Sequence, residues 1–209
     1  MLEVRNLEIT RGDRRLFGGL ALELKPGTLL RVKGSNGSGK TSLLRALCGL
    51  LLPTAGGVHW CGENIRTLRE EFWKNLIHIG HHNALKDDLS VRENLAVLCA
   101  VSGIVAGPDR QQAALADFGL AGREHLPAKV LSQGQRRRTA LARLALSAAL
   151  PLWILDEPFA ALDSAAVGHM QSIIGSHLDR GGMVVLTTHQ EAPIPALAVT
   201  ELDLDRGRN

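Results

Sequence analysis

The sequence contains no tyrosine and only 3% aromatic residues. Proteins that bind single-stranded nucleic acids stack the bases on aromatic side chains, so this composition argues against such a role. The three cysteines are scattered without CxxC spacing, which favours reduced core thiols in the cytosol over a disulfide framework. No apolar run reaches the roughly 18–20 residues that a membrane helix needs. The first residues also lack the pattern of a secretory signal.

Neither sign of charge dominates the chain. Lys and Arg number 24 against 21 Asp and Glu, for a net charge of +3, and the basic residues are spread along the whole sequence. Such a distribution does not form a basic patch, so we expect no nucleic-acid partner. With 45% hydrophobic and 22% charged residues, the 209 residues are typical of a globular protein with a full core.

Segments with the period of strands alternate along the chain with segments typical of helices. We expect strands over 2–9, 20–24, 28–33, 58–61, 76–79, 152–155 and 183–187. We expect helices over 40–50, 90–101, 109–118, 132–149 and 164–179. The strands 152–155 and 183–187 are apolar except for Thr187 at the end of the second, as strands buried on both faces are. The pattern predicts an α/β domain with a largely parallel sheet.

A phosphate-binding loop is predicted at 34–41. Its sequence, GSNGSGKT, matches GxxxxGK[ST] and lies between an expected strand and an expected helix. Lys40 would reach the β- and γ-phosphates of ATP, and Thr41 would bind Mg²⁺. The residues expected to hold the nucleotide are Gly34, Ser35, Asn36, Gly37, Ser38, Gly39, Lys40, Thr41 and Ser42.

Two acids follow the apolar strand 152–155. At the carboxyl end of a central strand, Asp156 is placed to hold Mg²⁺ and Glu157 to act as general base for the water that attacks the γ-phosphate. Alone, the pair would equally fit an exposed strand end. Together with the loop at 34–41, it favours hydrolysis of ATP.

The segment 131–135, LSQGQ, distinguishes the families that share such loops. It resembles the LSGGQ signature of ATP-binding-cassette (ABC) proteins, with Gln133 in place of the first glycine. Ser132 and Gln135 also have the spacing of a helix capping box, and that interpretation is compatible with the first. Ala161-Leu162-Asp163 resembles the D-loop of the family, and His189, after the strand 183–187, resembles its switch histidine.

The resemblance to ABC proteins covers essentially the whole chain. It implies a single ATPase domain, 1–209, with a RecA-like core of 1–82 and 132–209 and an antiparallel β subdomain. The stretch 83–131 would be an inserted helical subdomain. It also implies a homodimer that forms on ATP binding, in which Ser132, Gly134 and Gln135 contact the ATP of the other copy. His189 would contact the γ-phosphate and help to position the water.

Two positions depart from the family pattern. His82 stands where the family has a glutamine, and its imidazole could bind Mg²⁺-bound water. His81 and His82 could instead be exposed loop residues, or a two-histidine metal site. Arg11 stands where an aromatic ring usually stacks on adenine; it could stack there itself or be solvated. The run 136–138, three arginines, we interpret as solvated or packing residues of the signature helix.

Several segments resemble one branch, the CcmA family of haem-exporter ATP-binding subunits in cytochrome c maturation. They are 34–41, 75–95, 131–144, 152–163 and 184–190. The resemblance implies an ATPase peripheral to the cytoplasmic face of the inner membrane, bound to integral membrane subunits and supporting haem export. The alternatives are the ATPase of another ABC exporter and a soluble cassette acting on nucleic acid or the ribosome. A small P-loop kinase would not explain 131–135.

Overall fold

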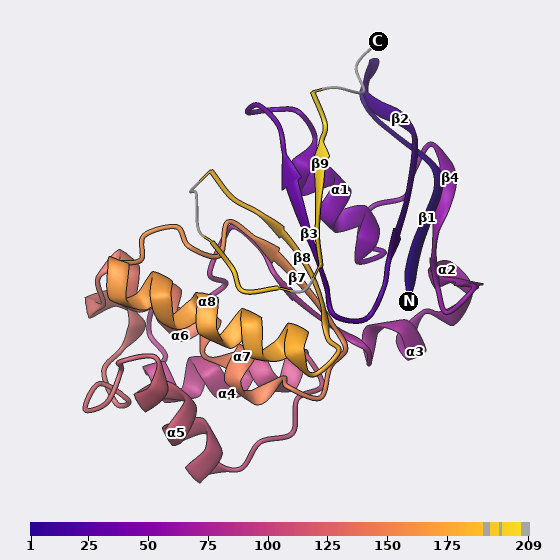
Figure 1. Cartoon of the computed structure of the whole chain (residues 1–209). Helices are drawn as coiled ribbons and strands as arrows, with labels where there is room; N and C mark the ends of the chain where they lie inside the picture. The colour runs from indigo at the N-terminus through magenta and orange to yellow at the C-terminus, as the bar shows by residue number, and fades with distance from the viewer. Residues whose placement is uncertain (190–192, 197, 206–209) are drawn as a thin grey trace.

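The computed structural model describes residues 1–189, 193–196 and 198–205, and its architecture is two sheets with helices around them (Figure 1). The larger sheet has the order β6-β7-β8-β3-β9, and all its pairings are parallel. Its strands are β3 (Thr28–Lys33), β6 (Leu76–Ile79), β7 (Leu152–Asp156), β8 (Met183–Thr187) and β9 (Ala198–Asp203). The predicted parallel α/β sheet is therefore confirmed, whereas β9 was not predicted.

The smaller sheet is antiparallel, with the order β2-β1-β4-β5. Its strands are β1 (Leu2–Arg11), β2 (Arg14–Leu24), β4 (Ala55–Trp60) and β5 (Glu63–Asn64). The predicted strand 20–24 is too short, because Gly18 and Gly19 interrupt the alternation of side chains although β2 continues through them. The pairing of β1 with β2 carries register shifts in the same region.

The helices that cover the sheets are mostly where the sequence predicts them. They are α1 (Lys40–Leu47), α2 (Ile65–Leu68), α3 (Glu70–Trp73), α4 (Val91–Val101), α5 (Pro108–Asp117), η1 (Ala128–Val130), α6 (Gln133–Leu141), α7 (Arg143–Leu146) and α8 (Ser164–Asp179). The long helix predicted over 132–149 is wrong. α6 and α7 are separate, and α7 ends where the Ser147 hydroxyl donates to the carbonyl of Leu144.

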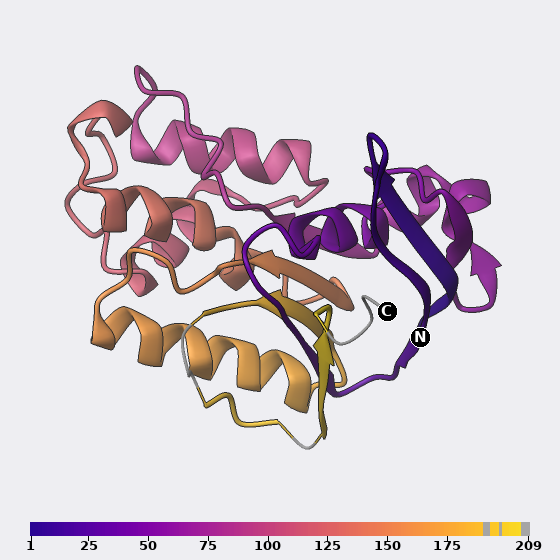
Figure 2. The same ribbon diagram turned by 90° about the horizontal axis from the view of Figure 1, so that it is seen from above.

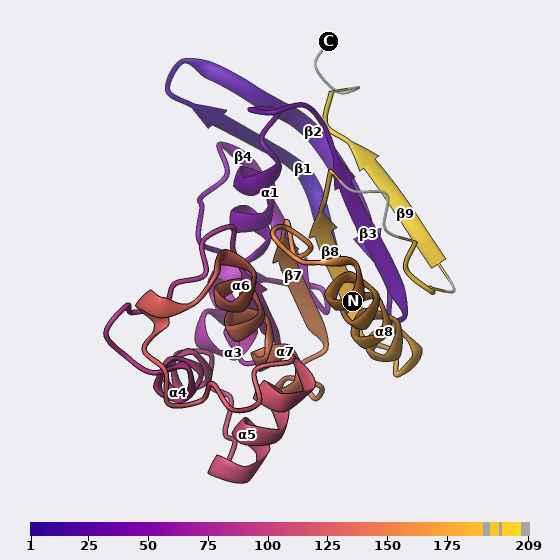
Figure 3. The same ribbon diagram turned by 90° about the vertical axis from the view of Figure 1, so that its left-hand side faces the viewer.

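Alternate side chains of the parallel sheet enter two different cores, since neighbours on a strand point to opposite faces. On one face, Trp153 and Leu155 of β7 pack with α8 and the helices between 91 and 146. On the other, Leu152 and Ile154 pack with α1 and the antiparallel sheet. Figures 2 and 3 show these layers, with the N-terminal strands and the helices α4 and α5 at opposite ends of the molecule.

All strands of the larger sheet run in one direction, so the segments that follow β3, β6, β7 and β8 leave from the same edge. The predicted phosphate loop, the two histidines, Glu157 and His189 belong to those segments, and Asp156 is the last residue of β7. No helix in the part of the chain that the structure describes is long and apolar enough to cross a membrane.

Candidate nucleotide-binding site

The loop between β3 and α1 has the backbone geometry of a phosphate cradle. Gly34, Gly37 and Gly39 have φ values of 144°, 77° and 107°, in the range that favours glycine. A Cβ on Gly34 would lie 2.5 Å from Oγ of Ser38, which leaves no room for a side chain. Lys40 Nζ donates to the carbonyl of Gly34 at 2.7 Å and so lies across the loop. The amide groups at the start of α1 face the same space, where a helix favours anions.

Thr41 and Asp156 meet at the centre of the site. Thr41 Oγ1 donates to Asp156 Oδ2 at 2.9 Å, and Thr187 Oγ1 donates to Oδ1 at 2.7 Å. Asp156 is 3% exposed, so these bonds fix its carboxylate. A hydroxyl and a carboxylate beside a phosphate loop are the hard oxygen ligands that Mg²⁺ prefers, and the residues present therefore fit this ion.

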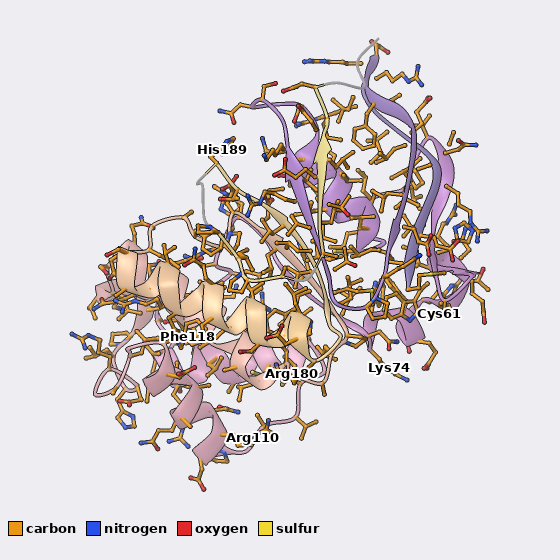
Figure 4. All side chains as sticks on the ribbon, in the orientation of Figure 1. Cys61, Lys74, Arg110, Phe118, Arg180 and His189 are labelled. Carbon is orange, nitrogen blue, oxygen red and sulfur yellow. The ribbon has the colours of Figure 1, made fainter. Side chains whose placement is uncertain are left out.

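Glu157 lies directly beyond β7 with its backbone in a left-handed conformation, φ 49°. Its amide donates to Thr187 Oγ1 at 2.9 Å. Its Oε1 is buried and accepts no hydrogen bond from the described residues, while His189 Nε2 lies 3.5 Å away. Figure 4 shows His189 at the end of β8, on the opposite side of the molecule from Cys61 and Lys74. Glu157 Oε2 accepts from the amide of His189 at 3.4 Å. A carboxylate with one oxygen not hydrogen-bonded by the described residues, beside an imidazole, is suited to accept a proton.

These groups line one cleft of about 500 Å³. The residues around it are Arg11, Leu16, Asn36, Gly37, Gly39, Lys40, Thr41, Ser42, His81, Asp156, Glu157 and His189. Arg11 is thus at the cleft, next to the apolar side chain of Leu16. Of the phosphate-loop residues predicted to bind the nucleotide, Gly34, Ser35 and Ser38 do not line this cleft. Among the described residues that line this cleft, none comes from the signature segment 131–135.

The two adjacent histidines face different spaces. His81, which the sequence analysis named only in its alternatives for the histidine pair, lines the nucleotide cleft, whereas His82 lines a neighbouring cleft of about 510 Å³. The second cleft also includes Gln133 and Arg136 of the signature helix. His81 therefore shares the cleft of Thr41 and Asp156 and His82 does not, because consecutive side chains of a loop without helical turns diverge. A role of His82 at the metal stays a prediction.

Ser35 has a partner that the sequence does not reveal. Its amide donates to Asp205 Oδ2 at 2.6 Å and its hydroxyl to Oδ1 at 2.9 Å. Both donors of Ser35 thus point to the C-terminal segment, and a contact of Ser35 with phosphate stays a prediction. Only the pairing of β9 with β3 brings Asp205 to the loop, so no local pattern could have found this contact.

The signature segment starts α6 as a capping box. Ser132 Oγ accepts from the amide of Gln135 at 3.2 Å, and Gln135 Oε1 accepts from the amide of Ser132 at 2.9 Å. A Cβ on Gly134 would lie 2.8 Å from the carbonyl oxygen of Ala161, so only glycine allows this close approach. Ala161 itself has a φ of 61°. The signature and the segment resembling the D-loop therefore pack together within one chain.

Arg137, on α6, was interpreted from the sequence as a solvated or packing residue together with its neighbours. It is 3% exposed, and its guanidinium donates to the carbonyls of Asp156 and Glu157. Burial lowers the pKa of Arg137, and the nearby carboxylates of Asp156 and Glu157 oppose that shift. The side chain remains a cation at neutral pH.

The sequence is similar to those of known ATP-binding transporter proteins, in agreement with the phosphate loop and the two acids at the cleft. A family model of ABC transporters matches residues 17–160. A cytochrome c biogenesis ATP-binding export protein of Dechloromonas aromatica, named CcmA, is 53% identical over 98% of this chain and 100% of its own length. The protein of the same name from Nitrosomonas europaea is 52% identical over 98% of this chain and 95% of its own.

Solved structures share the fold at lower identity. An ABC transporter ATP-binding protein of Pyrococcus furiosus superposes with a TM-score of 0.81 at 21% identity, covering 100% of this chain and 99% of that one. The ATP-binding cassette MJ0796, a dimer bound to ADP and Pi, gives a TM-score of 0.78 at 24% identity over 91% and 88% of the two chains. The chain therefore belongs to the ABC transporter family, and within it to the CcmA family of cytochrome c biogenesis ATP-binding export proteins.

Proposed function

We propose that this chain is the ATP-hydrolysing subunit of an exporter that serves cytochrome c biogenesis, as the names of its relatives suggest. The observation that carries the proposal is the convergence of Lys40, Thr41, Asp156, Glu157 and His189 on one cleft. These are the groups that phosphoryl transfer to water requires: a phosphate clamp, metal ligands, a base and a positioning group.

The phosphates of ATP would lie along the amides of the glycine loop, and the ammonium of Lys40 would exchange its bonds to the loop carbonyls for the β- and γ-phosphates. Thr41 and Asp156 would hold Mg²⁺, as would His81 through a water molecule, in place of His82. When bound, Mg²⁺ neutralises charge on the phosphates. The adenine would rest near Arg11 and Leu16, a position without an aromatic ring.

Hydrolysis then needs a base and an orienting group. Glu157 accepts a proton from water as the water oxygen bonds to the γ-phosphorus, and the bond from that phosphorus to the β,γ-bridging oxygen breaks. ADP and phosphate leave. His189, 3.5 Å from Glu157 Oε1, holds the water and the γ-phosphate in line.

The signature segment would act on a second copy. Ser132, Gly134 and Gln135 lie at the start of α6, a helix terminus that suits a phosphate, outside the chain's own cleft. A homodimer that closes on ATP would bring each signature to the other copy's γ-phosphate. Each copy then contributes its phosphate loop to one site and its signature to the other.

Integral membrane subunits would bind to a separate apolar cleft of about 530 Å³. It lies between α3 and the end of α4, and Leu50, Trp73 and Val101 are 52%, 49% and 83% exposed there. Apolar surface of this kind is typical of a protein–protein contact. The chain would then be peripheral to the cytoplasmic face of the inner membrane.

Replacement of the base tests the catalytic part of the proposal. Glu157→Gln keeps the shape of the side chain but cannot take a proton, so ATP turnover should be lost while ATP binding remains. Size-exclusion chromatography with ATP and Mg²⁺ should then show a dimer that the parent forms only transiently. Turnover at the parent rate would contradict the assignment of Glu157.

Genetic complementation tests the exporter part. In a strain that lacks its own CcmA relative, the parent chain should restore haem-stained c-type cytochromes, and Lys40→Ala should not. Val101→Asp should hydrolyse ATP like the parent when isolated but fail to co-purify with the membrane subunits. Restoration by Lys40→Ala, or unchanged co-purification of Val101→Asp, would count against the corresponding part.

A further inference from the structure

The guanidinium of Arg137 binds two segments at once. Its Nη1 donates to the carbonyl of Gly80 and to Asn83 Oδ1, both at 3.1 Å. Its Nη2 donates to the carbonyls of Asp156 at 3.0 Å and Glu157 at 2.8 Å. The first pair of acceptors flanks the two histidines after β6, and the second pair is the end of β7. One buried side chain of α6 therefore joins the signature helix to both catalytic segments.

The Arg137 bonds matter most at Glu157, whose conformation is unusual. A φ of 49° is uncommon for a residue with a side chain and persists only when its surroundings enforce it. Here the amide of Glu157 donates to Thr187 Oγ1, and its carbonyl accepts from Arg137. The backbone is thus held on both sides, and this conformation sets the direction of the carboxylate.

A second buried arginine provides a comparison. Arg143 of α7 is 8% exposed and donates to the carbonyl of His78, within β6, and to the hydroxyl of Ser102. Burial lowers the pKa of Arg143 to about 10. Arg143 has the same type of partners as Arg137, yet none of them belongs to a catalytic segment. The two arginines therefore differ in the segments that they bind: Arg137 binds segments with candidate catalytic residues, and Arg143 does not.

We infer that Arg137 is a positioning residue: it sets the carboxylate of Glu157 and ties it to the signature helix, so that the two half-sites of one copy move as a unit. The inference rests on the proposed role of Glu157 as base. Its consequence is that a change at Arg137 should lower the rate of the chemical step more than the affinity for ATP, although Arg137 does not line the cleft.

Paired substitutions in the full chain test this inference. Arg137→Met and Arg143→Met each remove a buried guanidinium of equal size. In Arg137→Met we expect kcat for ATP to fall by about 10–100-fold, the range for a misplaced catalytic group. The affinity for a fluorescent ATP analogue should change by less than about threefold, which is within a modest binding effect. Arg143→Met should keep kcat within about threefold of the parent.

Conservative variants keep the test decisive if the methionine variants fail to fold. Arg137→Gln can still donate to carbonyls and should recover part of kcat relative to Arg137→Met; Arg143→Gln serves as its control. Thermal unfolding of all four variants measures the structural cost. The inference is overturned if kcat falls equally in both series, in proportion to the loss of thermal stability, or if Arg137→Met keeps the parent kcat.

Glu157→Gln separates this inference from the proposal on which it rests. If Glu157→Gln turns over ATP at the parent rate, the base is another group and both statements fall. If Glu157→Gln is inactive and Arg137→Met behaves like Arg143→Met, only the role of Arg137 falls.

Discussion

The phosphate loop and the signature segment are both glycine-containing turns that start a helix, yet their surroundings differ. Around the phosphate loop, one chain supplies a lysine, a threonine, two acids and two histidines that line the same cleft. The signature segment is capped by its own residues, Ser132 and Gln135, and Gly134 packs against the carbonyl oxygen of Ala161. The first turn is surrounded by candidate catalytic groups from its own chain, whereas the second lies outside that cleft, as the proposed action on the nucleotide of another copy requires.

Arg137 relates the two regions to each other. It lies on the helix that the signature starts, and two of its four acceptors are the carbonyls of Asp156, the last residue of β7, and of Glu157, the residue after it. A rigid link of this kind would let the occupancy of one site affect the geometry of the other. If the signature of one copy completes the nucleotide site of the other, each site needs residues from two copies. Mixing two different variants tests this directly.

Mixing two inactive variants should give the largest effect. Lys40→Ala removes the phosphate clamp, and Ser132→Asp keeps a good helix N-cap while placing an anion at the signature. Each alone should lose turnover by about 100-fold or more. In an equimolar mixture half of the dimers are mixed and hold one intact site, so phosphate release should return to at most about a quarter of the parent rate.

The control for the mixture is Gln133→Ala at the exposed neighbouring position, which leaves the cap of Ser132 in place and should stay active. If each site were completed within one chain, the mixture would be no faster than either variant. That result would show that the phosphate loop and the signature act together within one copy, and it would contradict a site shared between two copies.

Gly134→Ala should give the next largest effect. Alanine is favoured over glycine inside a helix by about 1 kcal/mol, but a Cβ here would lie 2.8 Å from the carbonyl oxygen of Ala161. We expect the clash to prevail, with a loss of about 1–2 kcal/mol in the free energy of unfolding. Turnover should fall by about 10-fold as the signature shifts, an effect of about 1.4 kcal/mol.

Gln133→Ala, at the exposed neighbouring position, is the matched control and should match the parent in both measurements. Urea unfolding gives the stability and phosphate release gives the turnover. A gain in stability for Gly134→Ala would mean that the close packing against Ala161 is not required.

The elements with a local signal could be predicted from the sequence. The mostly apolar strand β8 and the helix α8 have the predicted bounds, and the loop predicted to bind phosphate lies between a strand and a helix as expected. Asp156 and Glu157 were identified as candidates because they follow an apolar strand. In each case the residues that determine the structure are neighbours in the chain.

Contacts between distant segments could not be predicted. The bond between Ser35 and Asp205 depends on the pairing of β9 with β3, and β9 is largely exposed with no clear alternation. The choice between His81 and His82 depends on how one loop turns. The prediction of a role for His189 remains untested, as do the roles of the other site residues.

A third region, the contact between α8 and the parallel sheet, does not line the nucleotide cleft. A change there should therefore alter the stability of the fold and not the catalytic step. His177 of α8 stacks on Trp153 of β7, with ring centroids 3.9 Å apart. Burial, with a further contribution from the charge of Arg180, lowers the pKa of His177 from 6.5 to about 4. Between these values the unfolded chain binds a proton that the folded chain excludes, so the free energy of unfolding should decrease as the pH falls from 6.5 to 4.

The loss from His177 should reach at most about 3 kcal/mol. His177→Phe keeps a flat ring beside Trp153 without a titrating group, and should flatten the decrease over this range. Urea unfolding at a series of pH values measures it, and His169→Phe, a partly exposed histidine on the same helix, is the control. An identical pH dependence in His177→Phe and the parent would contradict the assignment.

The contact between Asp205 and Ser35 should have the smallest effect, and it tests whether the phosphate loop depends on groups outside its own cleft. Asp205→Ala removes the acceptor for both donors of Ser35, but these are exposed and water can replace it. We expect about 1 kcal/mol at most, equivalent to a rise in KM for ATP of about fivefold or less with kcat unchanged. Ser35→Ala, which loses only the hydroxyl bond, should show a smaller rise. If Asp205→Ala lowered kcat instead, the C-terminal segment would act on the chemical step, and the loop could not be regarded as a site built from local sequence alone.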